Sequence, residues 1–342
     1  MSRAPAAGVA HKSRYLPGIL LLRSNPTSLS TSGLRAAVVG AGAFGRHHAT
    51  KYADMDGVRL VAIADPSVEA RAAAMAKFGV PTVADWRDLL GKVDVVSVCS
   101  PAVTHAAIVR GFLEAGVHVL VEKPIATTLS EADALIALAE EKDLVLTVGH
   151  QERFVFAHSG LLDFVDAPLA IECWRAGPWT GRGADVSSVL DLMIHDLDLV
   201  HRLIPGAVTD VQAEGRATHG RLADEVSAVV QFENGTQARL LSSRISDERR
   251  RGLRAVYPDG VIEIDFVTRQ VKNTTRRPLC APDLADPLGA SVAAFVAAAR
   301  SGAMTLVRPE EARRALETAL LIDEAATPRT QIRAGKEVAL QA

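Results

Sequence analysis

The chain has 342 residues, a length typical of two domains or one large one. Hydrophobic residues make up 48% and charged residues 23%, values that exclude a disordered, collagen-like or disulfide-scaffold protein. The 38 Lys and Arg residues against 40 Asp and Glu residues give a net charge of −2, without the basic excess of a nucleic-acid-binding protein. The three cysteines are widely spaced and form no C-x-x-C motif, a pattern that predicts no metal site, no disulfide framework and a reducing compartment such as the cytoplasm.

Residues 1–33 differ in composition from the rest of the chain, since they contain four Lys or Arg residues and no Asp or Glu. We interpret them as a disordered or non-native extension, because such segments bury too little apolar surface to fold. A transit peptide has the same composition and is the alternative. No apolar run approaches the roughly 20 residues that span a bilayer, so we expect no membrane contact.

From residue 34 onward, short apolar runs alternate with helical patterns. The expected strands cover 34–40, 59–65, 94–100, 117–122 and 144–149. The expected helices cover 44–52, 67–78 and 130–142, and a further helix ends near Gly116. Strands that alternate with helices of this length predict a doubly wound α/β domain with a parallel sheet over residues 34–150.

Beyond residue 150 the pattern changes to strands joined by turn sequences. We expect strands at 170–174, 228–232, 237–243, 255–257 and 261–266, and helices at 186–204, 290–300 and 309–326. Asn234-Gly235 and Pro258-Asp259-Gly260 are turn signals, since these residues suit the backbone angles of tight turns. Residues 151–342 are therefore expected to form a second domain of the α+β class with antiparallel strands.

A glycine-rich turn joins the first expected strand to the first expected helix. Its sequence, Gly40-Ala41-Gly42-Ala43-Phe44-Gly45, is the G-x-G-x-x-G pattern that binds a dinucleotide pyrophosphate at a helix N-terminus. Asp65 ends the second strand 20 residues later, where a carboxylate binds the adenosine ribose. That carboxylate repels the extra phosphate of NADP, so NAD is the favoured cofactor. The alternatives are an ordinary turn and an Asp65 that only caps the following helix.

Two more strand ends meet the same edge of the sheet, where ligands bind in open α/β folds. Glu122-Lys123-Pro124 ends one strand, and Ser100-Pro101 ends another with His105 shortly after it. A lysine at this place is either a functional group or a solvated strand end. We expect these residues to line the same crevice as the glycine-rich turn.

The segment 186–204 carries a conspicuous polar pattern. In an α-helix, Asp191, His195, Asp198 and Arg202 fall at i, i+4, i+7 and i+11, on one face. One interpretation is an amphipathic helix whose polar stripe faces water. The other places the stripe in a cleft, where Asp191 orients the His195 imidazole and supports its protonated form. The pattern alone leaves both open.

Together these segments resemble the Gfo/Idh/MocA oxidoreductase family. The resemblance rests on the glycine-rich turn, Asp65 and the segments 95–105, 122–124, 149–154 and 191–196, which occur in the family's order. It implies a Rossmann domain followed by an open, mostly antiparallel sheet for substrate binding and oligomer contacts. It implies that the catalytic residues are Lys123, Asp191 and His195. It also implies that NAD is bound by Gly40, Gly42, Ala43, Phe44, Gly45, Asp65, Ser100, Pro101, His105, Glu122 and Lys123.

The reaction implied by this resemblance is NAD-dependent oxidation of a secondary hydroxyl group of a sugar. His195 is expected to remove the hydroxyl proton as general base. Lys123 is expected to hydrogen-bond the same oxygen and stabilise its developing charge. Asp191 is expected to hold the imidazole tautomer.

Within the family, the segments 149–154, 189–198 and 242–246 are similar to the bacterial UDP-N-acetylglucosamine 3-dehydrogenases of lipid A biosynthesis. This similarity implies oxidation of the 3-hydroxyl of that nucleotide sugar by a homodimer or homotetramer. It implies substrate contacts by Lys123, Arg153, Arg182, Asp191 and His195. The chain departs from the group at Val155 and Phe156, where Asn and Pro are expected. The alternatives are a dehydrogenase of another sugar or a cyclitol such as myo-inositol, and a non-catalytic NAD-binding protein.

Overall fold

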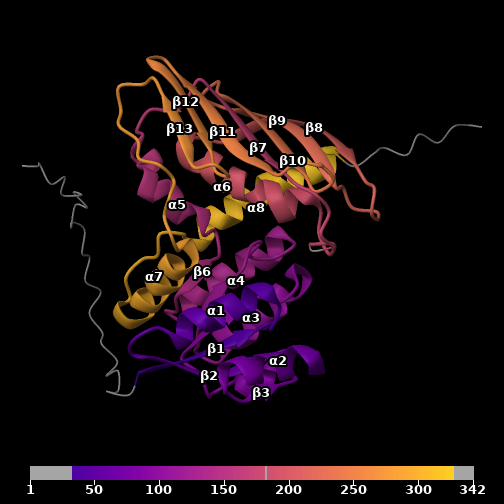
Figure 1. The fold of residues 1–342 in the computed structure, drawn as a ribbon, viewed down its shortest axis with the longest axis vertical. Helices are drawn as coiled ribbons and strands as arrows, with labels where there is room; N and C mark the ends of the chain where they lie inside the picture. Colours follow the sequence, from indigo (N-terminus) through magenta and orange to yellow (C-terminus); the bar gives the residue numbers. More distant parts are fainter. Residues whose placement is uncertain (1–32, 182, 327–342) are drawn as a thin grey trace, which may run out of the picture.

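The computed structural model describes residues 33–181 and 183–326. Two sheets lie toward opposite ends of the molecule, with helices around and between them (Figure 1). The predicted fold class is confirmed, because a doubly wound parallel domain precedes an α+β domain with an open, mostly antiparallel sheet. No helix in these ranges is both long and apolar enough to cross a membrane.

The first sheet has six parallel strands in the order β3-β2-β1-β4-β5-β6. Every residue of β4 and nearly every residue of β1 is buried, because helices cover both faces. The strands are β1 (Leu34–Val39), β2 (Val58–Ala64), β3 (Thr82–Val83), β4 (Val95–Val98), β5 (His118–Val121) and β6 (Leu146–Val148). The helices that follow these strands are α1 (Ala43–Ala53), α2 (Val68–Phe78), α3 (His105–Glu114) and α4 (Leu129–Glu141), with short 3₁₀ turns η1 (Trp86–Leu89) and η2 (Ala102–Thr104).

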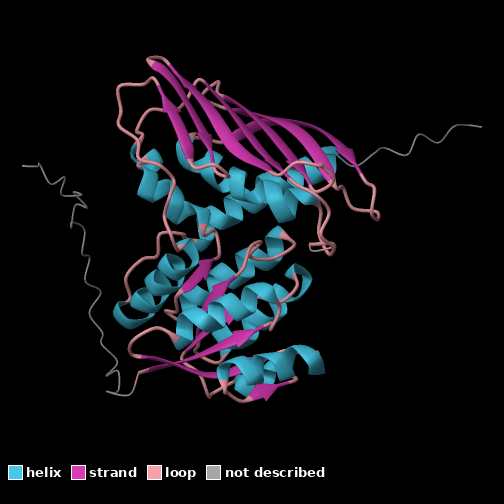
Figure 2. Ribbon diagram, in the orientation of Figure 1, coloured by secondary structure: helices cyan, strands magenta, loops and turns pink. Residues whose placement is uncertain are grey.

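The second sheet has seven strands in the order β13-β12-β11-β7-β10-β9-β8. All neighbouring pairs are antiparallel except β7 and β10, which run parallel. Among the described residues, helices cover only the face turned toward the first domain (Figure 2). Buried and more exposed side chains alternate along β9 for this reason. The strands are β7 (Ala170–Ala176), β8 (Val208–Arg216), β9 (Glu225–Phe232), β10 (Gln237–Ser243), β11 (Arg250–Tyr257), β12 (Gly260–Asp265) and β13 (Gln270–Asn273).

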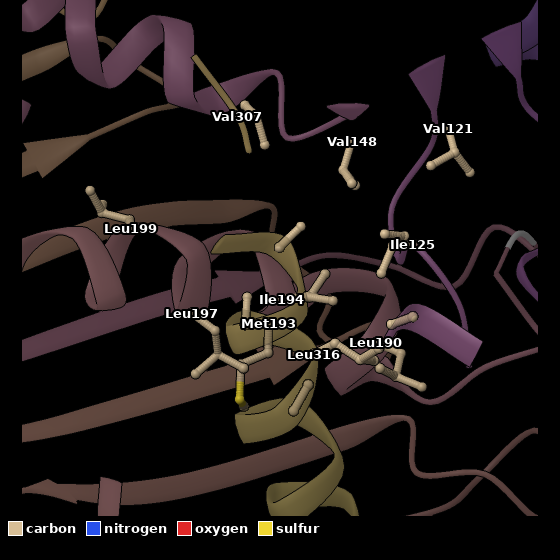
Figure 3. Close-up of a cluster of buried hydrophobic side chains, with 14 of the residues drawn as sticks. Val121, Ile125, Val148, Leu190, Met193, Ile194, Leu197, Leu199, Val307 and Leu316 are labelled. Carbon is tan, nitrogen blue, oxygen red and sulfur yellow. The ribbon is translucent and has the colours of Figure 1, made fainter. Parts of the chain in front are cut away.

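The helix expected at 186–204 is present, but its first part is wound differently. It begins as a π-helical turn, η4 (Val189–Met193), and continues as α6 (Ile194–Leu203). Apolar side chains of both parts, including Met193 and Leu197, pack around Leu316 of α8 (Pro309–Ala326) (Figure 3). This packing fixes the helix between the second sheet and the first domain. The short helices α5 (Glu152–Ser159) and η3 (Leu161–Asp163) complete the layer.

Helix α7 (Pro287–Ser301) packs with the first domain, although it follows the second sheet in the chain. Its buried Val292 and Phe295 share one apolar cluster with Leu34 of β1 and Tyr52 of α1. Figure 1 shows α7 beside α1 and apart from the strands of the second sheet. Helix α7 belongs to the segment expected to form the second domain, but its apolar face is buried on the α1 side of the parallel sheet.

Candidate active site

A cavity of about 1470 Å³ lies between the two domains. Its walls come from the carboxyl ends of the parallel strands, the η4–α6 helix and the facing strands of the second sheet. Ligand pockets usually measure about 300–1,000 Å³, so this cavity has room for two ligands side by side. The expected residues that line it are Gly40, Gly42, Ala43, Phe44, Asp65, Ser100, Pro101, His105, Glu122, Lys123, Asp191 and His195.

The glycine-rich turn shows which glycines the fold itself requires. Gly40 has a φ of +95°, and a Cβ there would lie 2.6 Å from the Cys99 carbonyl oxygen. A Cβ on Gly45 would lie 1.7 Å from the Gly40 carbonyl oxygen, so Gly45 lets α1 approach β1. A Cβ on Gly42 meets nothing within 4 Å, although Gly42 lines the cavity. The open space in front of Gly42 is what a bound pyrophosphate needs, and the turn therefore fits a dinucleotide.

Asp65 binds the backbone at two places, the start of α2 and the glycine-rich turn. One carboxylate oxygen accepts a hydrogen bond from the Ser67 backbone N–H at 2.8 Å, at the start of α2. The other accepts from the backbone N–H of Ala41 in the glycine-rich turn at 2.6 Å. The carboxylate also lines the cavity. It therefore fastens the turn to β2 and lies where an adenosine ribose is expected.

His105 and Glu122 lie on the cavity wall, but their polar atoms bind other parts of the protein. The His105 ring nitrogens lie 2.7 Å from the Pro124 carbonyl oxygen and 2.9 Å from that of Ser100. The Glu122 carboxylate lies 2.9 Å from the His48 imidazole and accepts a hydrogen bond from Gln151 at 2.8 Å. Both side chains thus hold the strand-end loops in place.

Lys123 and Asp191 form an ion pair at the wall of the cavity. The Lys123 ammonium donates to the Asp191 backbone carbonyl at 2.5 Å and to its carboxylate at 3.0 Å. The ion pair joins the end of β5 to the π-helical turn, and so joins the two domains. The expectation that Asp191 orients His195 is corrected, because the Asp191 carboxylate binds Lys123 and His195 Nδ1 has no hydrogen-bond partner.

His195 lines the cavity with a neutral imidazole. Its pKa is held well below the usual value by burial, and next by the positive charges of Lys123 and Arg175. Its Nδ1 is enclosed by protein, so Nε2 is the nitrogen available to the cavity. The ring of His150 stands edge-on to it, with 6.0 Å between the centroids. A neutral imidazole facing a cavity is a proton acceptor.

Arg153 was expected to contact substrate, and the structure contradicts this. Its side chain is fully buried outside the cavity wall, where it donates to Asp198 at 2.9 Å and to Glu311 at 2.9 Å. Asp198 is buried as well, and its carboxylate is the partner of Arg153 in the core. The polar stripe expected on one face is therefore divided, with Asp191 and His195 on the cavity and Asp198 in the core.

Arg182, the other arginine expected to bind substrate, lies outside the described residues. Its neighbour Trp179 lines the cavity, stacked on the His219 ring with 4.4 Å between centroids. The guanidinium of Arg244 lies 5.0 Å from the Trp179 ring centre. Arg244 is itself bonded to Asp224 at 2.8 Å.

Sequence reasoning missed a group of charged residues on the second-sheet side of the cavity. Arg175 of β7 donates to Glu152 at 2.6 Å and to Asp196 at 2.7 Å. Arg249 and Arg251, at the start of β11, line the cavity beside them. The alternation of side chains along a strand could have indicated that Arg251 and Arg175 face the same side of the sheet as other cavity residues.

Comparison with known proteins agrees with this architecture. Residues 34–150 match the model of the Gfo/Idh/MocA oxidoreductase family with its NAD-binding Rossmann fold, and residues 163–263 match a Gfo/Idh/MocA C-terminal domain. The chain belongs to the Gfo/Idh/MocA family. Like other members, it is an oxidoreductase that acts on CH–OH groups with NAD as cofactor.

Several relatives are informative. The UDP-N-acetylglucosamine 3-dehydrogenase of Acidithiobacillus ferrooxidans is 37% identical over 235 residues, which cover 68% of this chain and 74% of the relative. A solved structure of that enzyme has a TM-score of 0.80 and 33% identity, covering 86% of this chain and 98% of the other. The inositol 2-dehydrogenase of Rhodococcus erythropolis is 30% identical, covering 59% of this chain and 63% of the relative.

Proposed function

We propose that the protein oxidises the 3-hydroxyl group of UDP-N-acetylglucosamine with NAD as hydride acceptor. The observation that carries the proposal is the Lys123–Asp191 ion pair beside a neutral His195, in a cavity large enough for cofactor and substrate together. The 37% identity to a UDP-N-acetylglucosamine 3-dehydrogenase supports the choice of substrate.

The cofactor is proposed to lie along the carboxyl edge of the first sheet. The glycine-rich turn would hold the pyrophosphate, Asp65 the adenosine ribose, and the loops at Ser100 and Lys123 the nicotinamide half. When NAD is bound, its nicotinamide ring is the group that accepts the hydride.

The protein's own residues handle the proton and the charge on the substrate oxygen. His195 accepts the hydroxyl proton at Nε2, which its low pKa leaves free at neutral pH. An ammonium group has three N–H donors, and Lys123 uses two of them on Asp191. The third is available to the substrate oxygen, where it stabilises the negative charge that develops during oxidation. Asp191 is thus a positioning residue for Lys123.

A cyclitol such as myo-inositol is the competing substrate class, supported by the 30% identity to an inositol 2-dehydrogenase. The arginines on the second-sheet side of the cavity favour the nucleotide sugar, because guanidinium groups bind phosphate oxygens and a neutral cyclitol carries none.

A substrate panel tests the proposal. Purified protein with NAD is expected to form NADH with UDP-N-acetylglucosamine and to react far more slowly with free N-acetylglucosamine or myo-inositol. The His195→Ala variant measures the background. Turnover of the cyclitol or the free sugar, with none of the nucleotide sugar, contradicts the proposal.

We also propose that the enzyme is a cytoplasmic homodimer or homotetramer. The three free cysteines suit a reducing compartment. Sedimentation velocity of the purified protein tests the oligomeric state, and a monomer at micromolar concentration contradicts it.

A further inference from the structure

Three consecutive arginines stand where β11 begins: Arg249 directly precedes the strand, and Arg250 and Arg251 are its first two residues. Arg249 and Arg251 line the cavity, whereas Arg250 between them is exposed and does not. Successive side chains of a strand point to opposite faces, which explains why Arg251 faces the cavity and Arg250 does not. Two guanidinium groups from one short segment therefore reach the same wall.

The carboxylate nearest these two arginines, that of Glu152, is already bound by another arginine. Glu152 lies 3.8 Å from Arg251, but its carboxylate accepts two shorter hydrogen bonds from Arg175, at 2.6 Å and 2.5 Å. Within the described ranges, no carboxylate lies within ion-pair distance of Arg249. Burial lowers the pKa of Arg251, and the charges of Arg175 and Arg249 lower it further while Glu152 opposes them.

The wall consequently carries more positive than negative charge. The guanidinium groups of Arg175, Arg249 and Arg251 and the carboxylate of Glu152 line this wall, whereas the buried Asp196 lies behind it and pairs with Arg175. Arg249 is exposed and the Arg251 side chain is 34% exposed, so both guanidinium groups are accessible to an anion that enters the cavity. Guanidinium groups bind phosphate oxygens through paired N–H donors, so the fitting ligand is a phosphate or diphosphate.

The positions of these arginines also suit an anionic group of the substrate. Arg175 and Arg251 line the same cavity as His195, the proposed proton acceptor. They approach the cavity from the second sheet, opposite the glycine-rich turn of the first domain. An anion bound there belongs to the substrate and not to the dinucleotide.

We infer that Arg249 and Arg251 form the subsite for the diphosphate of a nucleotide-sugar substrate. This inference rests on the proposed function and assigns the diphosphate to described residues instead of Arg182. Arg175 completes the wall but is occupied by Glu152 and Asp196, and it acts by holding Glu152 away from the anion.

The test is binding of UDP to protein saturated with NADH, measured by titration calorimetry. Saturation closes the dinucleotide site, so that UDP reports on the substrate site alone. Arg249→Met and Arg251→Met are each expected to weaken UDP binding by about 10- to 100-fold, as for loss of a charge-assisted contact. Arg250→Met is the matched control and is expected to bind UDP as the wild type does.

Folding is checked through the affinity for NADH, which all three variants are expected to keep. Arg249 is exposed, so Arg249→Met tests the inference even if Arg251→Met is unstable. Arg251→Lys keeps the positive charge but loses the paired N–H donors of the guanidinium group. This variant is expected to bind UDP with intermediate affinity.

The possible failures are distinguishable. If the wild type binds UDP and the variants at 249 and 251 bind it as tightly as Arg250→Met, the subsite is wrong and the proposed function stands. If the NADH-saturated wild type does not bind UDP while it oxidises a cyclitol, the proposed function itself is wrong.

Discussion

Replacing Arg153 by Met is expected to destabilise the protein without a direct effect on substrate binding. The Arg153 side chain is 1% exposed, and its partner Asp198 is 2% exposed. The substitution keeps the apolar volume but leaves the Asp198 carboxylate buried without its partner. Removing one member of a buried ion pair costs about 3–5 kcal/mol. At roughly 2–4 °C per kcal/mol, the Tm is expected to fall by about 6–20 °C.

The loss should depend on pH in a defined direction. Burial raises the pKa of Asp198, but the nearby charges of His150 and Arg153 outweigh it and hold this pKa below its usual value. Asp198 therefore stabilises the wild type above its unfolded pKa, and this contribution is lost as the pH falls through the folded pKa. Without Arg153 the burial effect dominates and the carboxylate becomes protonated at higher pH. The difference between variant and wild type is therefore expected to be larger at pH 7 than near pH 4.

Thermal and denaturant unfolding measure the effect, with Arg202→Met as the control. Arg202 is 40% exposed and lies 3.6 Å from Glu311, so its removal is expected to cost at most about 1 kcal/mol. The double variant Arg153→Met, Asp198→Leu is expected to regain part of the loss, because no buried charge remains unpaired. The reasoning is refuted if Arg153→Met unfolds like the wild type and instead raises the KM for substrate.

Four further outcomes are expected. Gly42→Ala should keep the Tm but weaken NAD binding, because its Cβ meets no protein atom, whereas Gly45→Ala should lower both in the same thermal and NAD titrations. Asp65→Ala should reduce the preference for NAD over NADP in steady-state kinetics; a wild type that prefers NADP contradicts the assignment. Lys123→Met and His195→Ala should each lower kcat by about 10²- to 10⁴-fold with NAD affinity largely kept; near-normal turnover in either argues against its role. Because the low pKa of His195 keeps it neutral, kcat/KM should not decline for this reason until well below pH 6.5, and an acid limb at or above that pH argues against His195 as the base.

Most of the first domain could be predicted because its strands are buried on both faces. A strand such as β4 is apolar except for Ser97 and fully buried, which is typical of a parallel sheet covered by helices on both faces. The edge strands β8 and β13 were missed because most of their residues are polar and partly exposed. Helix α7 was detected, but its packing onto the first domain depends on contacts between residues distant in the chain.

The candidate site was also predictable only in part. The strand-end residues from the glycine-rich turn to Lys123 were expected in one crevice because they end parallel strands of one sheet, and they line one cavity. That Asp191 and His195 join them was implied by the family resemblance, since the helical spacing alone left their side open. The polar partners within the site were not predictable from spacing. Asp198 turns away from the cavity although it lies in the same helix as His195, and the buried partners of Arg153 come from helices far away in sequence.

The most direct test of the central claim follows the hydrogen that leaves the substrate. UDP-N-acetylglucosamine labelled with deuterium at C3 is incubated with the protein and NAD, and the mass of the reduced cofactor is measured. We expect the reduced cofactor to carry deuterium, and to carry none when the label is at C4 instead. Unlabelled NADH from the C3-labelled sugar, or no reduced cofactor at all, contradicts the assignment of the protein as a 3-dehydrogenase of this nucleotide sugar.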